Sequence, residues 1–374
     1  MNHIELTTEQ LRVVVTSLEF LSEKKNGGSH LTLGGYAGTG KTTVIKEICD
    51  RLIAKGVRVQ VTSFAGKAVS VLRKKGIRTA KTLHSLMYEP VTDDETGRIH
   101  WMLKEFLPVD CVIIDEGSMI SNELYSDIRS FQLPMLFVGD PGQLEPIGSN
   151  PNLMRQPDLM LTQIHRQAQE SPILQLAHEV RNGVHIPAGE RIVGDSLVIA
   201  RIRQAPLLSK DVDQIICGFN NTRHKINRQA RSDLGLYGDV LRVGDKLICV
   251  RNNASSGLFN GMMVTVKKVR ASMNESVVAD LVDDEGLTRP YVSMNTSVLS
   301  GEVSLKNYAE GAMRNGRWLT GDFFEYGYAI TTHKSQGSEF EKVLVLEELS
   351  DAWDKNRWRY TAITRASKKL VYCR

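Results

Sequence analysis

The chain has 374 residues, of which 41% are hydrophobic and 24% charged, and its formal net charge is +4. This composition excludes a disordered or fibrous chain. Because single cores stop growing at roughly 250–300 residues, two or three compact units are expected. The mild positive charge permits a nucleic-acid partner without requiring one.

The cysteines and the N-terminus bear on the compartment. Five cysteines occur without any C-x-x-C pair: Cys49, Cys111, Cys217, Cys249 and Cys373. Several stand in apolar runs, which is typical of reduced core residues in a cytosolic protein. The polar, acidic stretch 1–10 is unlike a secretion signal, and no run approaches the roughly 18 apolar residues of a membrane span. We therefore expect a cytoplasmic protein that contacts no membrane.

A repeated order of strand, polar loop and helix runs from residue 30 to 140. The predicted strands are short and apolar: 31–33, 58–62, 111–114 and 136–138. Strands that are apolar on both faces are typical of parallel sheets covered by crossover helices. The order is interrupted at 88–107, where Pro90 and Gly97 flank acidic residues and predict an inserted hairpin with a tight turn.

The second half repeats the αβ pattern and then changes. A helix is predicted at 173–181, a strand at 214–219 and a basic helical stretch at 222–231. From about residue 245, short strands are separated by Asn-, Gly- and Ser-rich turns and predict a small β-barrel that ends near residue 324. Its predicted strands are 246–250, 263–269 and 276–282. Further αβ-type strands are predicted at 328–330, 343–346 and 370–372, so the barrel is expected to be inserted into the second αβ unit.

A phosphate-binding loop is predicted at Gly35–Thr42, which matches G-x-x-x-x-G-K-[ST] between a strand and a helix. Glycines let backbone N–H groups close around phosphates, Lys41 can reach the β- and γ-phosphates, and Thr42 can hold Mg²⁺. A Gly-rich turn is the alternative, but chance matches are expected in only roughly one or two per cent of chains of this length. The predicted nucleotide contacts in the loop are Gly38, Thr39, Gly40, Lys41, Thr42 and Thr43.

Two acidic residues, Asp115 and Glu116, end an apolar strand at the sheet edge where open αβ sheets bind ligands. Asp115 is predicted to share Mg²⁺ with Thr42, and Glu116 to act as general base on the attacking water. Alone, such a pair is more often a helix cap or a surface turn, and the phosphate loop favours hydrolysis. Gln143, after the strand 136–138, is placed to orient water or sense the γ-phosphate, with a simple Pro-Gly turn as an equal alternative.

Arg166 and Arg365 stand far from the phosphate loop, each in an apolar or small-residue context. Singly, each is somewhat better explained as a surface ion pair. Together on a second domain, they would suit arginine fingers, which reach across a cleft between domains to the nucleotide. Such arginines stabilise charge on the γ-phosphate and raise the hydrolysis rate roughly 10³–10⁵-fold.

A dense polar run, Thr331–Glu339, follows the strand predicted at 328–330. Its hydroxyls, His333 and Lys334 suit contacts to phosphate or sugar, and a solvated loop is the alternative. The segment Thr82–Ser85, which contains His84, has the same character.

In this order, the motifs resemble those of superfamily 1 DNA helicases, specifically the RecD-like and phage Dda-like branch that moves 5′ to 3′. The resemblance runs from Gln10 to Arg365. It implies a Q motif at 6–10, in which Gln10 reads the adenine, and motifs I, II, III and V at 35–42, 115–116, 139–143 and 331–339. Arg166 would lie in motif IV and Arg365 in motif VI, and motif V would contact both DNA and nucleotide, the latter through Gly337 and Glu339.

The sequence also departs from the family pattern. In motif Ia, Ser63–Ala68 lacks the usual Pro and Thr, so Phe64 rather than a threonine is expected to meet the DNA, by stacking on a base. Motif III has Glu145 where Pro is usual. No nuclease constellation and no long N-terminal extension are evident, which favours a bare motor core.

The resemblance implies an α/β fold of two RecA-like P-loop domains, with a small β-hairpin insertion in the first and an SH3-like β-barrel insertion in the second. The first domain (1A) is expected at 1–165, with the strand-separating pin (1B) at about 86–107. The second domain (2A) is expected at 166–374, with the SH3-like insertion (2B) at about 243–325.

The expected function is an ATP-dependent 5′ to 3′ DNA helicase in replication, recombination or repair that uses ATP and Mg²⁺. The expected partners of this monomeric motor are single-stranded DNA, junctions of single- and double-stranded DNA, and single-strand-binding or replisome proteins. The expected DNA contacts are Phe64, Lys67, His84, Asn221, Thr332, His333 and Lys334. An RNA-directed helicase is one alternative, because no 2′-OH reader is identifiable in the sequence. A non-unwinding ATPase or remodeller is another. A nucleotide-switched binding module or clamp loader is a third, since it could use the same P-loop without moving along a strand.

Overall fold

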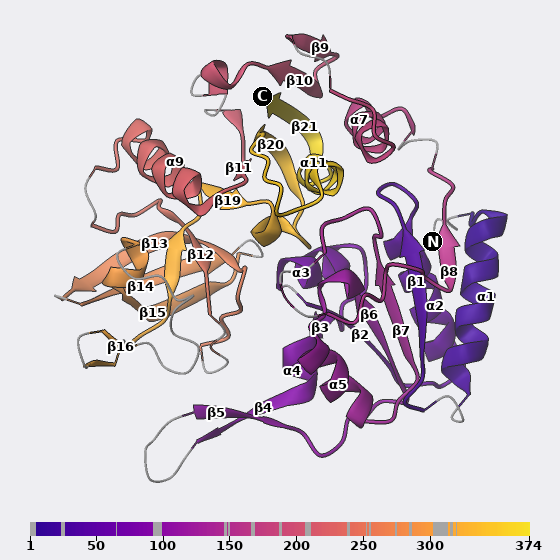
Figure 1. Cartoon of the computed structure of the whole chain (residues 1–374). Helices are drawn as coiled ribbons and strands as arrows, with labels where there is room; N and C mark the ends of the chain where they lie inside the picture. Colours follow the sequence, from indigo (N-terminus) through magenta and orange to yellow (C-terminus); the bar gives the residue numbers. More distant parts are fainter. Residues whose placement is uncertain are drawn as a thin grey trace.

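The computed structural model describes residues 5–23, 27–64, 66–92, 99–145, 148, 150–165, 169–186, 189–205, 211–237, 240–251, 253, 256–273, 275–283, 286–301, 313–314, 317–318 and 320–374. Two α/β units and a smaller β-sheet make up the fold (Figure 1). In that view the first unit, in indigo to magenta, lies at the lower right, the second lies above it, and the smaller sheet lies at the left.

The first unit is built on a six-stranded parallel sheet of order β3-β2-β6-β7-β1-β8. Its strands are β1 (His30–Gly35), β2 (Val59–Ser63), β3 (Lys81–Thr82), β6 (Cys111–Asp115), β7 (Met135–Gly139) and β8 (Leu159–Leu161). The four strands predicted in this region coincide with β1, β2, β6 and β7 to within two residues. The two edge strands, β3 and β8, were not predicted because they are too short for a periodic pattern.

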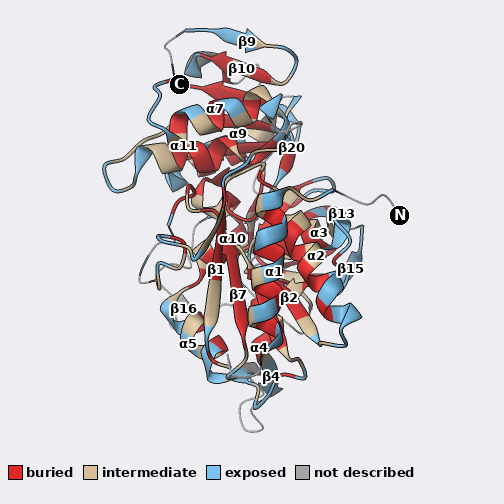
Figure 2. Cartoon of the chain, turned by 90° about the vertical axis from the view of Figure 1, so that its right-hand side faces the viewer, coloured by how far each residue is buried: buried red, intermediate tan, exposed pale blue. Residues whose placement is uncertain are grey.

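Helices cover both faces of this sheet. Alternate residues of β6 show why, since Cys111 and Ile113 pack into one apolar cluster while Val112 and Ile114 pack into another. The first cluster is closed by α1 (Thr8–Ser22), α2 (Lys41–Ala54) and α3 (Gly66–Lys74), and the second by α4 (Leu83–Met87) and α5 (Asn122–Ser130). Strand β7 is consequently buried along its whole length (Figure 2).

The second unit has a six-stranded sheet of order β19-β11-β20-β21-β10-β9, parallel except for the edge strand β9. Its strands are β9 (Arg191–Val193), β10 (Leu197–Ala200), β11 (Gln214–Cys217), β19 (Ala329–Thr331), β20 (Phe340–Leu346) and β21 (Ala366–Cys373). Helices α7 (Pro172–Arg181) and α11 (Lys355–Ile363) pack together on one face, and α9 (Asn220–Asp233) contributes to the cluster on the other. The predicted helix at 173–181 and the predicted strands of this unit are therefore confirmed.

The smaller sheet is antiparallel, five-stranded and of order β15-β14-β13-β12-β18. Its strands are β12 (Lys246–Cys249), β13 (Met263–Ser272), β14 (Ser276–Asp283), β15 (Thr288–Asn295) and β18 (Phe324–Tyr326). A bridge between Met294 and Asp322 brings the end of β15 against the chain that enters β18, so the sheet curls back on itself. The short helix α10 (Thr296–Leu299) follows β15, and β16 (Met313–Arg314) pairs with β17 (Arg317–Trp318).

An antiparallel pair, β4 (Tyr88–Thr92) and β5 (Ile99–Leu103), extends from the first unit at the bottom of Figure 1. The turn predicted between these strands, with Gly97, lies outside the described residues. All five cysteines are buried and free, which confirms their assignment to the core. Among the described helices, none combines the length and the apolar character needed to cross a bilayer.

Candidate nucleotide site and nucleic-acid surface

The predicted phosphate-binding loop joins the end of β1 to the start of α2. Gly40 caps α2 with a left-handed φ of 82°. A Cβ at Gly40 would lie 2.5 Å from Gln10 Nε2 and 2.6 Å from His165 Nε2, so both the backbone angle and the space require glycine. The N-terminus of α2, which favours anions, therefore faces a cavity of about 770 Å³.

This cavity lies between the two α/β units, because both supply its walls. The predicted residues that line it are Gly38, Gly40, Lys41, Thr42, Thr43, Asp115, Glu116, Gln143, Gly337, Glu339 and Arg365. Its volume is in the range of small-molecule and cofactor sites. The structure thus brings together motifs that are separated by up to about three hundred residues in the sequence.

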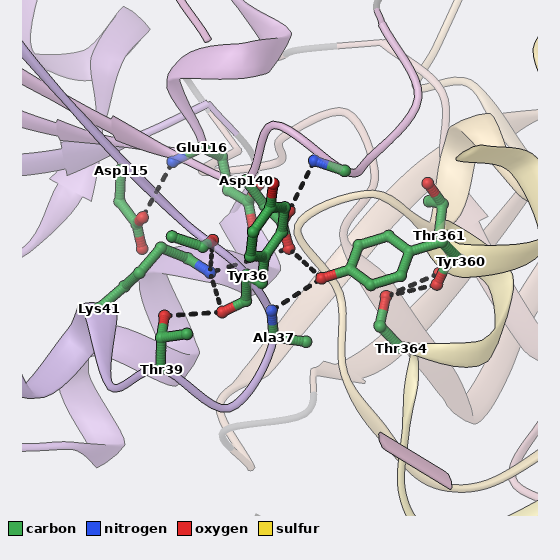
Figure 3. A network of polar contacts seen from close by, with 12 residues as sticks. Tyr36, Ala37, Thr39, Lys41, Asp115, Glu116, Asp140, Tyr360, Thr361 and Thr364 are labelled. Carbon is green, nitrogen blue, oxygen red and sulfur yellow. Dashed lines mark hydrogen bonds and ion pairs between the residues drawn. The ribbon is translucent and has the colours of Figure 1, made fainter. Parts of the chain in front are cut away.

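Lys41 is folded back on its own loop. Its ammonium group donates to the carbonyls of Gly35 at 2.7 Å and Tyr36 at 3.2 Å, and lies 3.9 Å from Asp140 Oδ2 (Figure 3). Carbonyl oxygens hold the ammonium group there, so Lys41 would have to exchange these bonds to bind a phosphate in the cavity.

The two acidic residues at the end of β6 have shifted proton affinities. Burial raises the pKa of Asp115, and the charge of Lys41 opposes this rise. Burial and the neighbouring charge of Asp115 raise the pKa of Glu116 to about 7, against the opposing charges of Arg365 and Lys41. A carboxylate with a pKa near the working pH suits a general base. Glu116 also has a left-handed φ of 57°, a strained backbone state that is concentrated at functional sites.

Gln143 lies at the wall of the same cavity. It is 5% exposed, and its Oε1 is buried without a hydrogen-bond partner. An unpaired buried acceptor is costly, so this oxygen is available to accept from a donor bound in the cavity.

Arg365 enters the same cavity from the second unit. Its guanidinium donates to the carbonyls of Thr361 at 2.9 Å and Ser338 at 3.0 Å, and to Thr364 Oγ1 at 3.0 Å. These bonds fix the side chain against the end of α11. The other predicted arginine, Arg166, lies outside the described residues.

Gln10 does not face the cavity in this structure, contrary to the prediction that it reads the base. It is 1% exposed, its Oε1 accepts from Thr7 N at 3.1 Å, and its Nε2 donates to Thr39 O at 3.1 Å and His165 Nε2 at 2.6 Å. The two backbone partners fix the orientation of the amide. Thr39 is also 1% exposed, with its hydroxyl donating to Tyr36 O, so its side chain supports the loop. His165, the partner of Gln10, lines the cavity where Gln10 and Thr39 do not, and no sequence motif singled it out.

Two of the predicted DNA contacts of the first unit, Phe64 and His84, belong to an aromatic group at the base of the hairpin. The ring of His84 lies 6.2 Å from Phe64 and 5.6 Å from Tyr88, between ring centroids. His84 and Tyr88 line a second cavity, of about 1250 Å³, which is also lined by segments that flank the strands of the smaller sheet, including Arg251 and Phe259.

A second aromatic group lies at the end of the second unit's sheet. The ring of Trp353 is 5.4 Å from Phe219 and 5.6 Å from His333. Phe219 is 41% exposed, and the predicted contact Asn221 is exposed in the first turn of α9. Trp353 and Phe219 were not singled out because neither stands in a motif, although an aromatic residue just after a strand, such as Phe219 after β11, is a detectable signal.

Three predicted DNA contacts are engaged within the protein. Thr332 is fully buried and its hydroxyl donates to Cys217 O, so its predicted contact with DNA is wrong for this structure. The ammonium of Lys67 lies 3.4 Å from the centroid of Phe340 in the second unit. Lys334 donates to Glu325 at 2.8 Å. The sequence could not reveal these partners because each is distant along the chain or in another element.

Glu325 ties the smaller sheet to the second unit and provides a test of the fold. It accepts from Arg223 on α9 and from Lys334 beside β19. Burial favours its neutral form, but the charges and hydrogen bonds of Lys334 and Arg223 outweigh burial and hold its pKa at about 2.

We expect Glu325→Gln to lower the melting temperature at pH 7. A pKa depressed by about two units corresponds to about 3 kcal/mol, present above the ordinary pKa near 4.3 and lost as pH falls towards 2. The melting difference between wild type and variant should therefore shrink as pH falls from 5 to 3, as followed by circular dichroism. Glu341→Gln, which removes an exposed pair with Lys368, is the control with little expected effect. A difference that is independent of pH would contradict the assignment.

Two family models match the chain. The AAA domain model matches residues 6–194, and the UvrD-like helicase C-terminal domain model matches residues 326–373. Between them they cover the phosphate loop, the acidic pair and the polar run that ends at Glu339, and also Arg365.

The chain is also similar in sequence to curated DNA helicases and in fold to a solved helicase structure. The ATP-dependent RecD2 DNA helicase of Deinococcus radiodurans is 28% identical over 373 residues, which is 91% of this chain and 46% of that protein. The ATP-dependent DNA helicase dda of Enterobacteria phage T4 is 29% identical over 198 residues, 49% of this chain and 44% of that protein. The structure of Bacteroides Pif1 bound to ssDNA aligns with a TM-score of 0.59 at 18% identity, covering 99% of this chain and 92% of that one. That alignment shows a shared two-domain α/β helicase fold. The chain spans less than half of the length of the curated relatives it matches.

Proposed function

Because the chain belongs to the AAA domain family and to the superfamily 1 helicases of the RecD, Dda and Pif1 type, we propose that it is an ATP-dependent motor that moves 5′ to 3′ along single-stranded DNA and unwinds duplex. The observation that carries the proposal is the cavity between the units, which joins the phosphate loop and the acidic pair of the first to Arg365 of the second. A hydrolysis site built from two units changes shape as they move, which is what a motor requires.

The cavity supports the following roles in ATP hydrolysis. The N–H groups of the loop and Lys41 bind the phosphates, Glu116 accepts a proton from the attacking water, and Gln143 orients that water. Arg365 stabilises the charge that develops on the γ-phosphate. The Thr42 hydroxyl and the Asp115 carboxylate are hard oxygen donors on the same cavity, a set that fits Mg²⁺. Bound there, the ion would neutralise charge on the β- and γ-phosphates.

We assign the DNA track to the two aromatic groups, Phe64–His84–Tyr88 and Phe219–Trp353–His333. Aromatic rings bind successive bases of a single strand without sequence preference. Both groups stand near strand ends of their sheets, where open αβ folds bind ligands. The Bacteroides Pif1 structure that shares this fold is bound to single-stranded DNA, which is consistent with this assignment.

The two β insertions complete the proposed architecture. The pair β4 and β5 would be the pin (1B) at about 86–107, and the curled five-stranded sheet would be the SH3-like insertion (2B) at about 243–325. The proposed motor domains are 1A at 1–165 and 2A at 166–374. Single- to double-strand junctions would then meet the pin, and single-strand-binding or replisome proteins are the proposed further partners of a monomeric motor.

We expect Trp353→Ala to weaken binding of single-stranded DNA by about 5- to 100-fold, because stacking on one base is worth roughly 1–3 kcal/mol. Fluorescence anisotropy of a labelled oligodeoxythymidine measures the effect. Tyr237→Ala is the matched control, since Tyr237 is 68% exposed and stands outside both aromatic groups. Equal affinities of wild type and Trp353→Ala would remove Trp353 from the track.

Strand displacement tests the proposed function directly. Duplexes with a 5′ single-stranded tail should be unwound in the presence of ATP and Mg²⁺, and duplexes with a 3′ tail should not. Stimulation of ATP hydrolysis by DNA and RNA oligonucleotides of the same sequence separates a DNA motor from an RNA-directed one. Stimulated hydrolysis without unwinding of either duplex would replace the helicase proposal with a remodeller or a nucleotide-switched module.

A further inference from the structure

Tyr360 of α11 contacts two loops of the first unit with one hydroxyl group. Its oxygen accepts from the N–H of Ala37 in the phosphate loop at 2.7 Å and donates to Asp140 Oδ2 at 2.8 Å (Figure 3). These are hydrogen bonds across 323 and 220 residues of sequence. Both join the second unit to the nucleotide site.

The carbonyl group of Ala37 is also hydrogen-bonded by a residue of the second unit. His178 Nε2 lies 3.2 Å from Ala37 O, and since a carbonyl can only accept, this nitrogen carries the proton. On the same helix, α7, the guanidinium of Arg181 lies 3.5 Å from the ring centroid of Tyr36. Helices α7 and α11, which pack together, thus bracket the start of the phosphate loop.

Leu144 of the first unit is held in the same way, by Thr361, the next residue of α11, and by Gln336. Thr361 Oγ1 accepts from the N–H of Leu144 at 2.9 Å, and Gln336 Nε2 donates to Leu144 O at 2.6 Å. Leu144 follows Gln143 directly, so the segment that presents Gln143 is also held at its N–H and its C=O by the second unit.

The Tyr360 contact is buried and closely packed. Tyr360 is fully buried and Asp140 is 2% exposed. A Cβ at Gly142 would lie 2.9 Å from the ring of Tyr360, so glycine is needed for this approach. Burial and the charge of Asp140 raise the pKa of Tyr360 well above its ordinary value, so the hydroxyl keeps its proton and remains a donor.

The contact is connected to the reacting groups at both ends. Asp140 Oδ2, which accepts from Tyr360, lies 3.9 Å from the ammonium of Lys41. In the other direction, the last turn of α11 leads to Arg365, whose Nε donates to Thr361 O. A displacement of α11 relative to the phosphate loop therefore acts on both groups together.

We propose that Tyr360 is a positioning residue that transmits closure of the two units to the phosphate loop, by tying the helix that carries Arg365 to Ala37 and Asp140. This inference rests on the proposed ATP hydrolysis. In the closed arrangement the Tyr360 hydroxyl fixes the distance between the phosphate loop and Arg365. Without the hydroxyl, the two units close with Arg365 displaced from its position at the nucleotide site.

The decisive variant is Tyr360→Phe, which keeps the buried ring and removes only the hydroxyl. We expect the kcat of DNA-stimulated ATP hydrolysis to fall about tenfold, since hydrogen bonds to charged groups are the stronger class. Affinity for a fluorescent ADP analogue should change less than about twofold, because the phosphate contacts come from the first unit. The matched control is Tyr372→Phe, whose fully buried hydroxyl donates to Glu347 within the second unit and should leave kcat unchanged.

Amide hydrogen exchange tests the contact independently of activity. In Tyr360→Phe, the peptide that contains Ala37 should exchange faster than in wild type, because its N–H loses its partner. The same peptide in Tyr372→Phe should match wild type. Unchanged exchange in Tyr360→Phe, or an equal fall of kcat in both variants, would overturn the proposal.

Failure of the proposed function has a different signature. If wild type itself shows no DNA-stimulated hydrolysis, the motor assignment fails, and the exchange experiment still decides whether Tyr360 holds Ala37. If wild type is stimulated by DNA and Tyr360→Phe retains full kcat, the motor assignment stands and the positioning role of Tyr360 is refuted.

Discussion

Lys41→Ala is expected to reduce DNA-stimulated ATP hydrolysis by at least about 10²-fold, the usual loss when one preorganised donor to the transition state is removed. Lys41 is the cationic side chain of the phosphate loop, and its ammonium already lies among loop carbonyls at 2.7 and 3.2 Å. Phosphate release with and without oligodeoxynucleotide measures the loss. Binding of single-stranded DNA should stay within about twofold, because the proposed track lies on the aromatic groups.

The control for this experiment is Lys46→Ala. Lys46 lies on the same helix, five residues further along, and forms an exposed pair with Asp50. Exposed pairs contribute little, so hydrolysis and stability should both stay near wild type. Hydrolysis retained in Lys41→Ala, with Lys46→Ala also active, would contradict the nucleotide assignment for Gly35–Thr42.

The buried strands and the phosphate loop were predictable because their signals are local. A strand such as Cys111–Asp115 is apolar on both faces, and the loop needs glycine where φ is positive, so sequence spacing alone carries the information. The edge strands β3 and β8 have two and three residues, too few to show a period. Their place in the sheet is set by neighbours and not by their own composition.

The direction in which a polar side chain points could not be predicted. Thr7 and Gln10 form a capping box at the start of α1, and this local arrangement turns the Gln10 amide towards the loop carbonyl of Thr39. Its remaining hydrogen goes to His165, more than 150 residues away. A motif can therefore place Gln10 beside the nucleotide site without revealing that its polar atoms are already paired.

The contacts between the units were invisible for a related reason. Tyr360 stands in a segment of apolar and small residues, and nothing near it in sequence points to Ala37 or Asp140. Lys67 is among the DNA contacts expected from the family resemblance. Only the folded structure reveals that its charge lies over Phe340 of β20.

Arg365→Ala is expected to lower kcat for ATP hydrolysis by roughly 10³-fold or more, the effect of removing an arginine that stabilises charge on the γ-phosphate. Arg365 is 6% exposed, and the rest of the cavity is retained, so ADP binding should persist. Stopped-flow phosphate release measures kcat, and an ADP analogue measures binding. Lys368→Ala, which removes an exposed charge three residues along the chain, is the control and should be near neutral.

Arg365→Lys distinguishes charge from geometry at the same site. The guanidinium donates to Thr361 O, Ser338 O and Thr364 Oγ1, a planar pattern that a lysine cannot reproduce. We therefore expect lysine to recover less than about a tenth of the lost rate, because the charge would no longer be held at the cavity wall. Full recovery by lysine would mean that the site needs only a positive charge. In that case the fixed position of α11 would not contribute to catalysis, and the coupling through Tyr360 would have no arginine to position.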